Sequence, residues 1–280
     1  MKSVNEVKYL PPCVFQGGKQ RLANIICDII EEKEHSDFVF YDLCCGGGSV
    51  SMEMLNRGHK VVMVDKGLFG LFWEKIAKNE FDLDVFKGEI AKLPSVDKIQ
   101  EYLKDLSLKP VDSKLLPYQY LLLQAGAFGG KQIWVKDGKW QNNTFRSYWQ
   151  PTETSNRRSP VQPMIPIPST ILQRVENLFE VPKGYITAYH SDIREVIDIL
   201  NNDEREKVVY IDPPYMNSTK YYDDLDIYEI VNKINVKSLY ISEGVELKGF
   251  NSVVLSDGRK KGNMNGNVKK KPVVERLNFR

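Results

Sequence analysis

The chain has 280 residues, 42% of them apolar, with 27% charged residues and a net charge of +2. This balance suits a soluble protein with a sizeable core. This net charge does not require a nucleic-acid partner. It is also compatible with one that binds to a local cluster of basic residues. Four cysteines without C-x-x-C spacing argue against a zinc site and a disulfide framework. With no signal peptide and no apolar run of membrane-spanning length, a cytoplasmic location and no membrane partner are expected.

Strands and helices alternate in the first part of the chain. Apolar residues recur at helical spacing over residues 19–34, and an apolar run at 38–41 is closed by Asp42 and a glycine turn. A helix over about 50–57 should stop near Gly58, a strand at 61–64 ends at Asp65, and a helix follows over 68–78. This βαβα order predicts a parallel sheet.

The alternation breaks over residues 82–165. Helical pieces are expected at 96–106 and 117–128, and Asp137-Gly138 between two short apolar runs predicts a hairpin. Residues 150–169 are rich in Pro, Ser, Thr and Asn and carry Arg157 and Arg158. We interpret this span as an inserted, irregular subdomain.

The alternation then resumes. Strands are expected at 185–189, 208–212, 238–242, 252–255 and 273–277, with helices at 193–200 and 225–234. A basic loop rich in glycine and asparagine separates the last two strands.

The stretch "DLCCGGGSVS" lies between a strand and a helix, where glycines let the backbone approach a ligand closely. Asp65 ends the next strand and could accept hydrogen bonds from ribose hydroxyls, so the pair suggests an adenosine-containing cofactor. Ser51 stands where G-x-G-x-x-G would have its last glycine. A tight turn beside an unrelated aspartate remains the alternative reading.

The stretch "VVYIDPPY" begins as a buried strand and ends abruptly on Asp212. Pro213 and Pro214 cannot donate to a sheet ladder, so the strand must stop there. The carboxyl ends of parallel strands face the ligand crevice, which places Asp212 near Asp65. Asp212 and the Pro213 carbonyl are acceptors only, and Tyr215 adds an aromatic face. Such a site suits a planar group with two N–H donors, such as the exocyclic amine of a base.

Together these motifs resemble the α group of DNA adenine N(6)-methyltransferases, a family of D-P-P-Y amino-methyltransferases. The residues from Phe15 to Lys19 are similar to its aromatic-x-G-G-K motif, and "YISEG" and "VVERLNFR" resemble its closing strands. One departure is Leu43-Cys44, where the family usually carries Pro-Phe. The resemblance implies contacts to S-adenosyl-L-methionine by Phe15, Gly17, Lys19, Asp42, Gly46, Gly48, Asp65, Asp192 and Asp212.

The resemblance also implies the fold and the reaction. The expected fold is α/β, a doubly wound methyltransferase sheet, with catalytic parts at 1–81 and 166–280 and a target-recognition subdomain at 82–165. The expected reaction methylates a flipped adenine in double-stranded DNA, with Asp212, Pro213 and Tyr215 as catalytic residues and no metal. The basic residues expected to contact DNA phosphates are Arg157, Arg158, Lys260, Lys261, Lys269 and Lys270.

Several alternatives stay open. The same chemistry could act on the cytosine N(4) amine or on RNA adenine. A dinucleotide-binding oxidoreductase would use the glycine turn and Asp65 but would leave Asp212 and Tyr215 unexplained. A DNA-binding protein without catalysis is a further possibility. The sequence leaves the target site, the oligomeric state and any restriction-endonuclease partner or phage context unknown.

Overall fold

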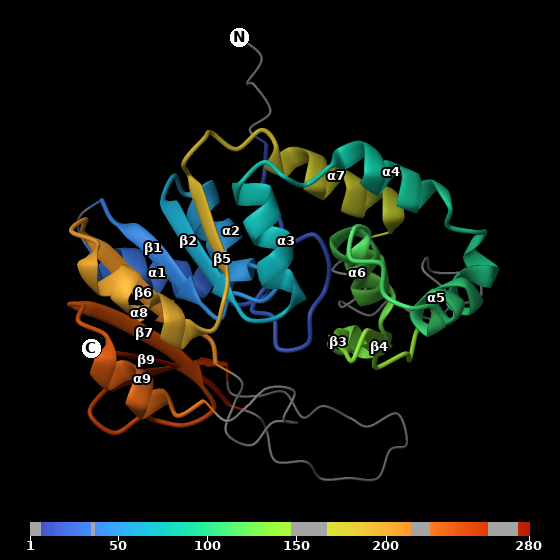
Figure 1. Ribbon diagram of the computed structural model, residues 1–280. Coiled ribbons are helices and arrows are strands. Elements are labelled where there is room, and N and C mark those ends of the chain that lie inside the picture. Colours follow the sequence, from blue (N-terminus) through green and yellow to red (C-terminus); the bar gives the residue numbers. More distant parts are fainter. Residues whose placement is uncertain (1–6, 35–36, 147–166, 214–224, 257–273) are drawn as a thin grey trace, which may run out of the picture.

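One lobe of the molecule is built on a seven-stranded sheet (Figure 1). The computed structural model describes residues 7–34, 37–146, 167–213, 225–256 and 274–280. The strands follow the order β5-β2-β1-β6-β7-β9-β8. Their bounds are β1 Val39–Leu43, β2 Lys60–Asp65, β5 Ile186–His190, β6 Lys207–Ile211, β7 Ser238–Glu243, β8 Asn251–Ser256 and β9 Glu275–Phe279.

The first five strands of this order run parallel, and β9 and β8 are antiparallel additions at one edge. Among the parallel strands, chain order runs outward in both directions from the neighbours β1 and β6, so the strand order reverses between them. In an open parallel sheet, such a switch point opens a crevice at the carboxyl ends of the strands. The predicted mixed α/β fold with a mostly parallel central sheet is confirmed.

Helices cover both faces of the sheet. Alternate strand residues enter two separate apolar clusters, as the two-residue period of a strand requires. One cluster joins the sheet to α1, α2 and α3, and the other joins it to α8 and α9. These helices span α1 Ala23–Lys33, α2 Ser49–Asn56, α3 Leu68–Ala77, α8 Ile193–Asn202 and α9 Ile227–Lys233.

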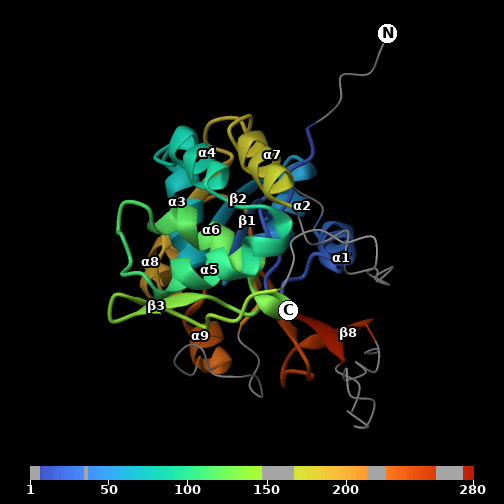
Figure 2. The ribbon, with the colours of Figure 1, turned by 90° about the vertical axis from the view of Figure 1, so that its right-hand side faces the viewer.

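A second lobe stands beside the sheet, on the far side of α3 (Figures 1 and 2). Its helices share the apolar cluster of α1–α3, so the lobe continues the same core. Its elements are α4 Leu83–Ala91, η1 Val96–Lys98, α5 Ile99–Leu108, α6 Leu116–Gly126, η2 Phe128–Gly130, β3 Trp134–Lys136, β4 Lys139–Gln141 and α7 Pro168–Leu178. The predicted hairpin is present, with positive φ at both Asp137 and Gly138.

Four sequence-based expectations need correction. The first helix begins at Ala23, because the carbonyl of Lys19 accepts from both Leu22 and Ala23 in a tight turn. Strand β1 continues to Leu43, so Asp42 lies within it. Helix α4 was not predicted, and α7 was assigned in part to an irregular stretch.

Within the described ranges, no helix combines the length and apolarity needed to cross a bilayer.

Candidate active site

The glycine turn after β1 is fixed by an aromatic side chain of α3. Gly46 and Gly48 have φ of 49° and 77°, which favour glycine. A Cβ on Gly48 would lie 2.6 Å from Cζ2 of Trp73, and the indole Nε1 of Trp73 donates to the Gly46 carbonyl at 2.9 Å. No sequence pattern predicts this contact, because Trp73 reads as one of several apolar residues of a helix.

The N-terminal motif packs directly on this turn. A Cβ on Gly46 would lie 3.2 Å from ring atoms of Phe15, and the Phe15 ring meets Phe69 edge-on with centroids 5.4 Å apart. The φ of Gly17 is 86°, which lets the chain turn between Phe15 and Lys19. The two segments that the resemblance assigns to the cofactor are therefore neighbours.

Asp42 is a buried carboxylate next to this turn, only 1% exposed. Its Oδ2 accepts a hydrogen bond from the Ser51 hydroxyl at 2.6 Å, and its Oδ1 has no hydrogen-bond partner in the described structure. Burial raises the pKa of Asp42 to about 7, and repulsion from Asp212 and Asp65 adds to the increase. Ser51, which interrupts the glycine pattern in the sequence, thus serves to hold Asp42.

Asp65 ends β2 on the same face of the sheet, two residues beyond the buried Met63. Its Oδ2 accepts from the Gly46 amide at 2.8 Å, and its Oδ1 accepts from the Gly67 amide at 2.7 Å. Burial raises the pKa of Asp65, and these two amide bonds oppose the increase. Asp65 therefore shapes the glycine turn at the carboxyl end of β2.

Asp212 follows β6 on the same face as Asp42. Asp42 pairs with Tyr210 across the two strands, and Asp212 lies two residues further along. The carboxylate is 18% exposed, and its Oδ1 lies 2.5 Å from the ammonium of Lys19, which is 5% exposed. Burial raises the pKa of Asp212, while attraction to Lys19 lowers it. Pro213 is buried, and Pro214 and Tyr215 lie outside the described residues.

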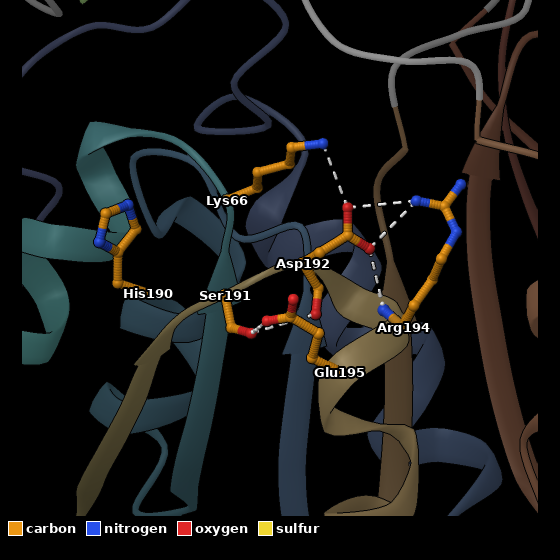
Figure 3. Close-up of a pocket in the computed structure, with 6 residues that line it drawn as sticks. All are labelled: Lys66, His190, Ser191, Asp192, Arg194 and Glu195. Atoms are coloured by element: carbon orange, nitrogen blue, oxygen red, sulfur yellow. Dashed lines mark hydrogen bonds and ion pairs between the residues drawn. The ribbon is translucent and has the colours of Figure 1, made fainter.

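Asp192 lines a hollow of about 510 Å³ at the carboxyl end of β5 (Figure 3). It caps α8 by accepting from the Arg194 amide at 3.0 Å, and its Oδ2 lies 3.3 Å from the ammonium of Lys66. Bonds to Arg194 and Lys66 lower the pKa of Asp192 against the opposing effect of burial. The hollow adjoins β2, because the Ser191 amide donates to the Asp65 carbonyl at 3.2 Å.

The structure thus gathers four predicted carboxylates at the carboxyl ends of neighbouring strands: Asp42, Asp65, Asp192 and Asp212. It places the glycine turn, Phe15 and Lys19 among them. The predicted DNA-contacting residues all lie outside the described residues: Arg157, Arg158, Lys260, Lys261, Lys269 and Lys270.

The comparison with known families agrees with this geometry. The model of the D12 class N6 adenine-specific DNA methyltransferases matches residues 15–109. This part of the chain is similar to that class. The matched part of the chain holds Phe15, the glycine turn, Asp42 and Asp65, while Asp212 lies beyond it. No curated protein matches the chain.

The match to this class implies S-adenosylmethionine as the methyl donor and DNA as the substrate. The residues present fit such a donor. A glycine turn leaves room for close approach of a ligand to the backbone, and the unpaired Oδ1 of Asp42 can accept a hydrogen bond. Clustered carboxylates also favour a ligand with positive charge, because a cation relieves the repulsion between them.

Proposed function

We propose that this methyltransferase transfers a methyl group from S-adenosylmethionine to the exocyclic amine of an adenine flipped out of double-stranded DNA. One observation carries the proposal: Asp42, Asp65 and Asp212 share one edge and one face of the sheet, beside the glycine turn. A cofactor motif and an acceptor for the target amine are thereby adjacent.

The donor would be held by the carboxylates around the glycine turn. Asp65 uses one acceptor position on each oxygen for a backbone amide, so further positions remain for ribose hydroxyls. Asp42 would accept from the donor through Oδ1, and Asp192 would face its adenine. The sulfonium supplies an activated methyl group, so the protein's own contribution is positioning and electrostatics.

The target amine would be held by Asp212 and the Pro213 carbonyl. Both groups accept hydrogen bonds only, and proline removes the backbone donor that would compete with the amine. Two accepted N–H bonds would fix the amine so that its lone pair faces the methyl group. Tyr215, which lies outside the described residues, would stack on the flipped base, as the resemblance implies.

DNA recognition is proposed for residues 82–165, as a target-recognition subdomain inserted between the catalytic parts at 1–81 and 166–280. The β3–β4 hairpin exposes Lys136 and Lys139 at its tip, where they could meet phosphates. Segment 127–131 of this lobe reaches the catalytic part directly, because the Gln16 amide donates to the Gly130 carbonyl at 2.8 Å. The basic residues that follow the hairpin and those of the loop after β8 would add phosphate contacts.

The decisive experiment measures single-turnover methyl transfer from labelled S-adenosylmethionine to duplexes of defined composition. A duplex whose amines include adenine should be methylated, whereas one that offers cytosine amines without adenine should not. Label on the cytosine duplex or on RNA alone would refute the adenine-DNA assignment. Modified-base sequencing of DNA from a host that expresses the protein would then identify the target site.

The dinucleotide alternative is tested by ligand-induced stabilisation. A ligand that binds the folded state raises the melting temperature with its concentration. S-Adenosylmethionine should stabilise the protein and NAD should not. Stabilisation by NAD together with none by S-adenosylmethionine would favour an oxidoreductase.

A further inference from the structure

The side chain of Lys19 connects two distant parts of the chain inside the crevice. Its ammonium donates to the Gly17 carbonyl at 3.2 Å and to Oδ1 of Asp212 at 2.5 Å. The partners Lys19 and Asp212 are 193 residues apart. The resemblance assigns Lys19 to the cofactor, whereas the geometry ties it to the residue that would hold the target amine.

Acidic groups from several strands lie around this ion pair in the described part of the chain. Asp42 approaches from β1, Glu243 from the end of β7 and Glu275 from the start of β9, and the Cys44 thiol follows β1. Lys19 supplies the positive charge that these groups face within the described part of the chain.

The charges of this cluster are coupled. Burial raises the pKa of Asp212, Lys19 opposes that increase, and Glu275 adds to it. Burial raises the pKa of Glu243, repulsion from Asp212 and Glu275 adds to that increase, and Lys19 opposes it. Removing the ammonium would leave both acids to take up protons at higher pH.

The ionised form of Asp212 matters for the reaction. A carboxylate only accepts hydrogen bonds, whereas a protonated carboxyl group carries an O–H that would confront the N–H donors of an amine. A carboxylate bound through one oxygen is also held in one orientation, so less freedom is lost when the substrate binds.

We propose that Lys19 is a positioning residue for methyl transfer, which keeps Asp212 ionised and occupies Oδ1 so that Oδ2 accepts the target amine. This inference rests on the proposed function. It gives the lysine of the N-terminal motif a role in the chemical step, separate from any contact with the cofactor.

The test is the pH dependence of single-turnover methyl transfer, measured at saturating S-adenosylmethionine from about pH 6 to about pH 9. Without the cation the pKa of Asp212 rises, so activity on the acid side is lost. Lys19→Met should lose about tenfold or more in rate near pH 7 and recover toward pH 9, with its acid limb displaced upward by about one pH unit or more. Lys19→Arg keeps the charge and should keep the limb close to that of the wild-type protein.

Lys207→Met is the matched control. Lys207 is a partly buried lysine at the start of β6, the strand that Asp212 follows. Its ammonium donates to the carbonyls of Leu200 and Asp203. The acid limb of this variant should coincide with that of the wild-type protein. Melting curves establish folding, and Lys19→Gln, which keeps an uncharged N–H donor, replaces Lys19→Met if the latter does not fold.

The outcomes are separable. Normal wild-type transfer together with an unmoved acid limb in both uncharged variants would overturn the inference and leave the proposed function intact. An unmoved limb with weaker S-adenosylmethionine binding in equilibrium dialysis would also overturn it, because Lys19 would then be a cofactor ligand. A wild-type protein that binds S-adenosylmethionine but methylates no DNA would overturn the proposed function, and the inference with it.

Discussion

Asp42 should make the free energy of unfolding fall as the pH rises, and Asp42→Asn should remove that dependence. Burial, together with repulsion from Asp212 and Asp65, raises the pKa of Asp42 from 3.8 to about 7. Because this pKa is higher in the folded state than in the unfolded state, the folded protein holds the proton more tightly. The resulting stability is fully present below pH 3.8 and is lost as the pH rises through about 7.

The size of the effect follows from this displacement. At about 1.4 kcal/mol per pH unit, the loss between about pH 5 and about pH 7 amounts to about 3 kcal/mol. Asp42 is 1% exposed, so screening by solvent removes little of it. Structural relaxation around the charge reduces it, and we expect about 1–3 kcal/mol. Asparagine imitates the protonated acid, since its oxygen can accept from Ser51 and its amide does not titrate.

The assay is urea unfolding of the wild-type protein and Asp42→Asn near pH 5 and near pH 8. The advantage of the variant should grow by about 1–3 kcal/mol between the two conditions, whatever constant offset the amide introduces. Asp226→Asn, at the exposed cap of α9, is the control and should show no comparable growth. Growth below about 0.5 kcal/mol for Asp42→Asn would refute the reasoning, because the buried carboxylate would then cost the fold nothing. The stabilised variant should bind S-adenosylmethionine more weakly, as expected where a site is kept at the expense of stability.

Three further predictions concern the crevice. Gly48→Ala should lower the free energy of unfolding in urea by about 3 kcal/mol or more, because its Cβ would strike the ring of Trp73. Gly58→Ala, where φ is 93° and the space is open, should lower it by about 1–2 kcal/mol. Equal losses would contradict the packing argument. Asp65→Ala should weaken S-adenosylmethionine binding by about 1–3 kcal/mol in calorimetry, and unchanged affinity would exclude the ribose role. Asp212→Asn should keep its melting temperature within a few degrees yet lose about a hundredfold or more in single-turnover rate; near-normal transfer by the folded variant would sink the proposed mechanism.

Local features of this protein can be predicted from short stretches of its sequence. Glycines after a strand predict a ligand-binding turn, because few residues other than glycine adopt positive φ at low cost. Asp137-Gly138 predicts the hairpin for the same reason. Prolines after Asp212 fix the end of β6, because they cannot extend a ladder. Each of these inferences depends on the chemistry of a few consecutive residues. The turn, the hairpin and the strand end are present in the described elements, while ligand binding at the turn stays a prediction.

Two helices that lack such turn and end signals, α4 and α7, differ from the sequence-based prediction. Helix α4 is nine residues long and contains Gly88, which lowers its helical propensity. Helix α7 follows a proline-rich stretch and begins with Pro168, which suits a first helical turn as well as a loop. Its buried residues Ile171, Val175 and Leu178 do recur at helical spacing, so the signal was present and was outweighed by composition.

Which charged side chains meet depends on the packing of the whole fold. Asp42 reads as the end of a strand in the sequence, yet β1 extends past it and places it opposite Ser51. Lys19 reads as part of a cofactor motif, yet its ammonium reaches Asp212 across the switch point between β1 and β6. Pairings over such separations are set by strand order and by the face to which each side chain points. Neither is encoded in neighbouring residues, since each results from packing the whole sheet against its helices.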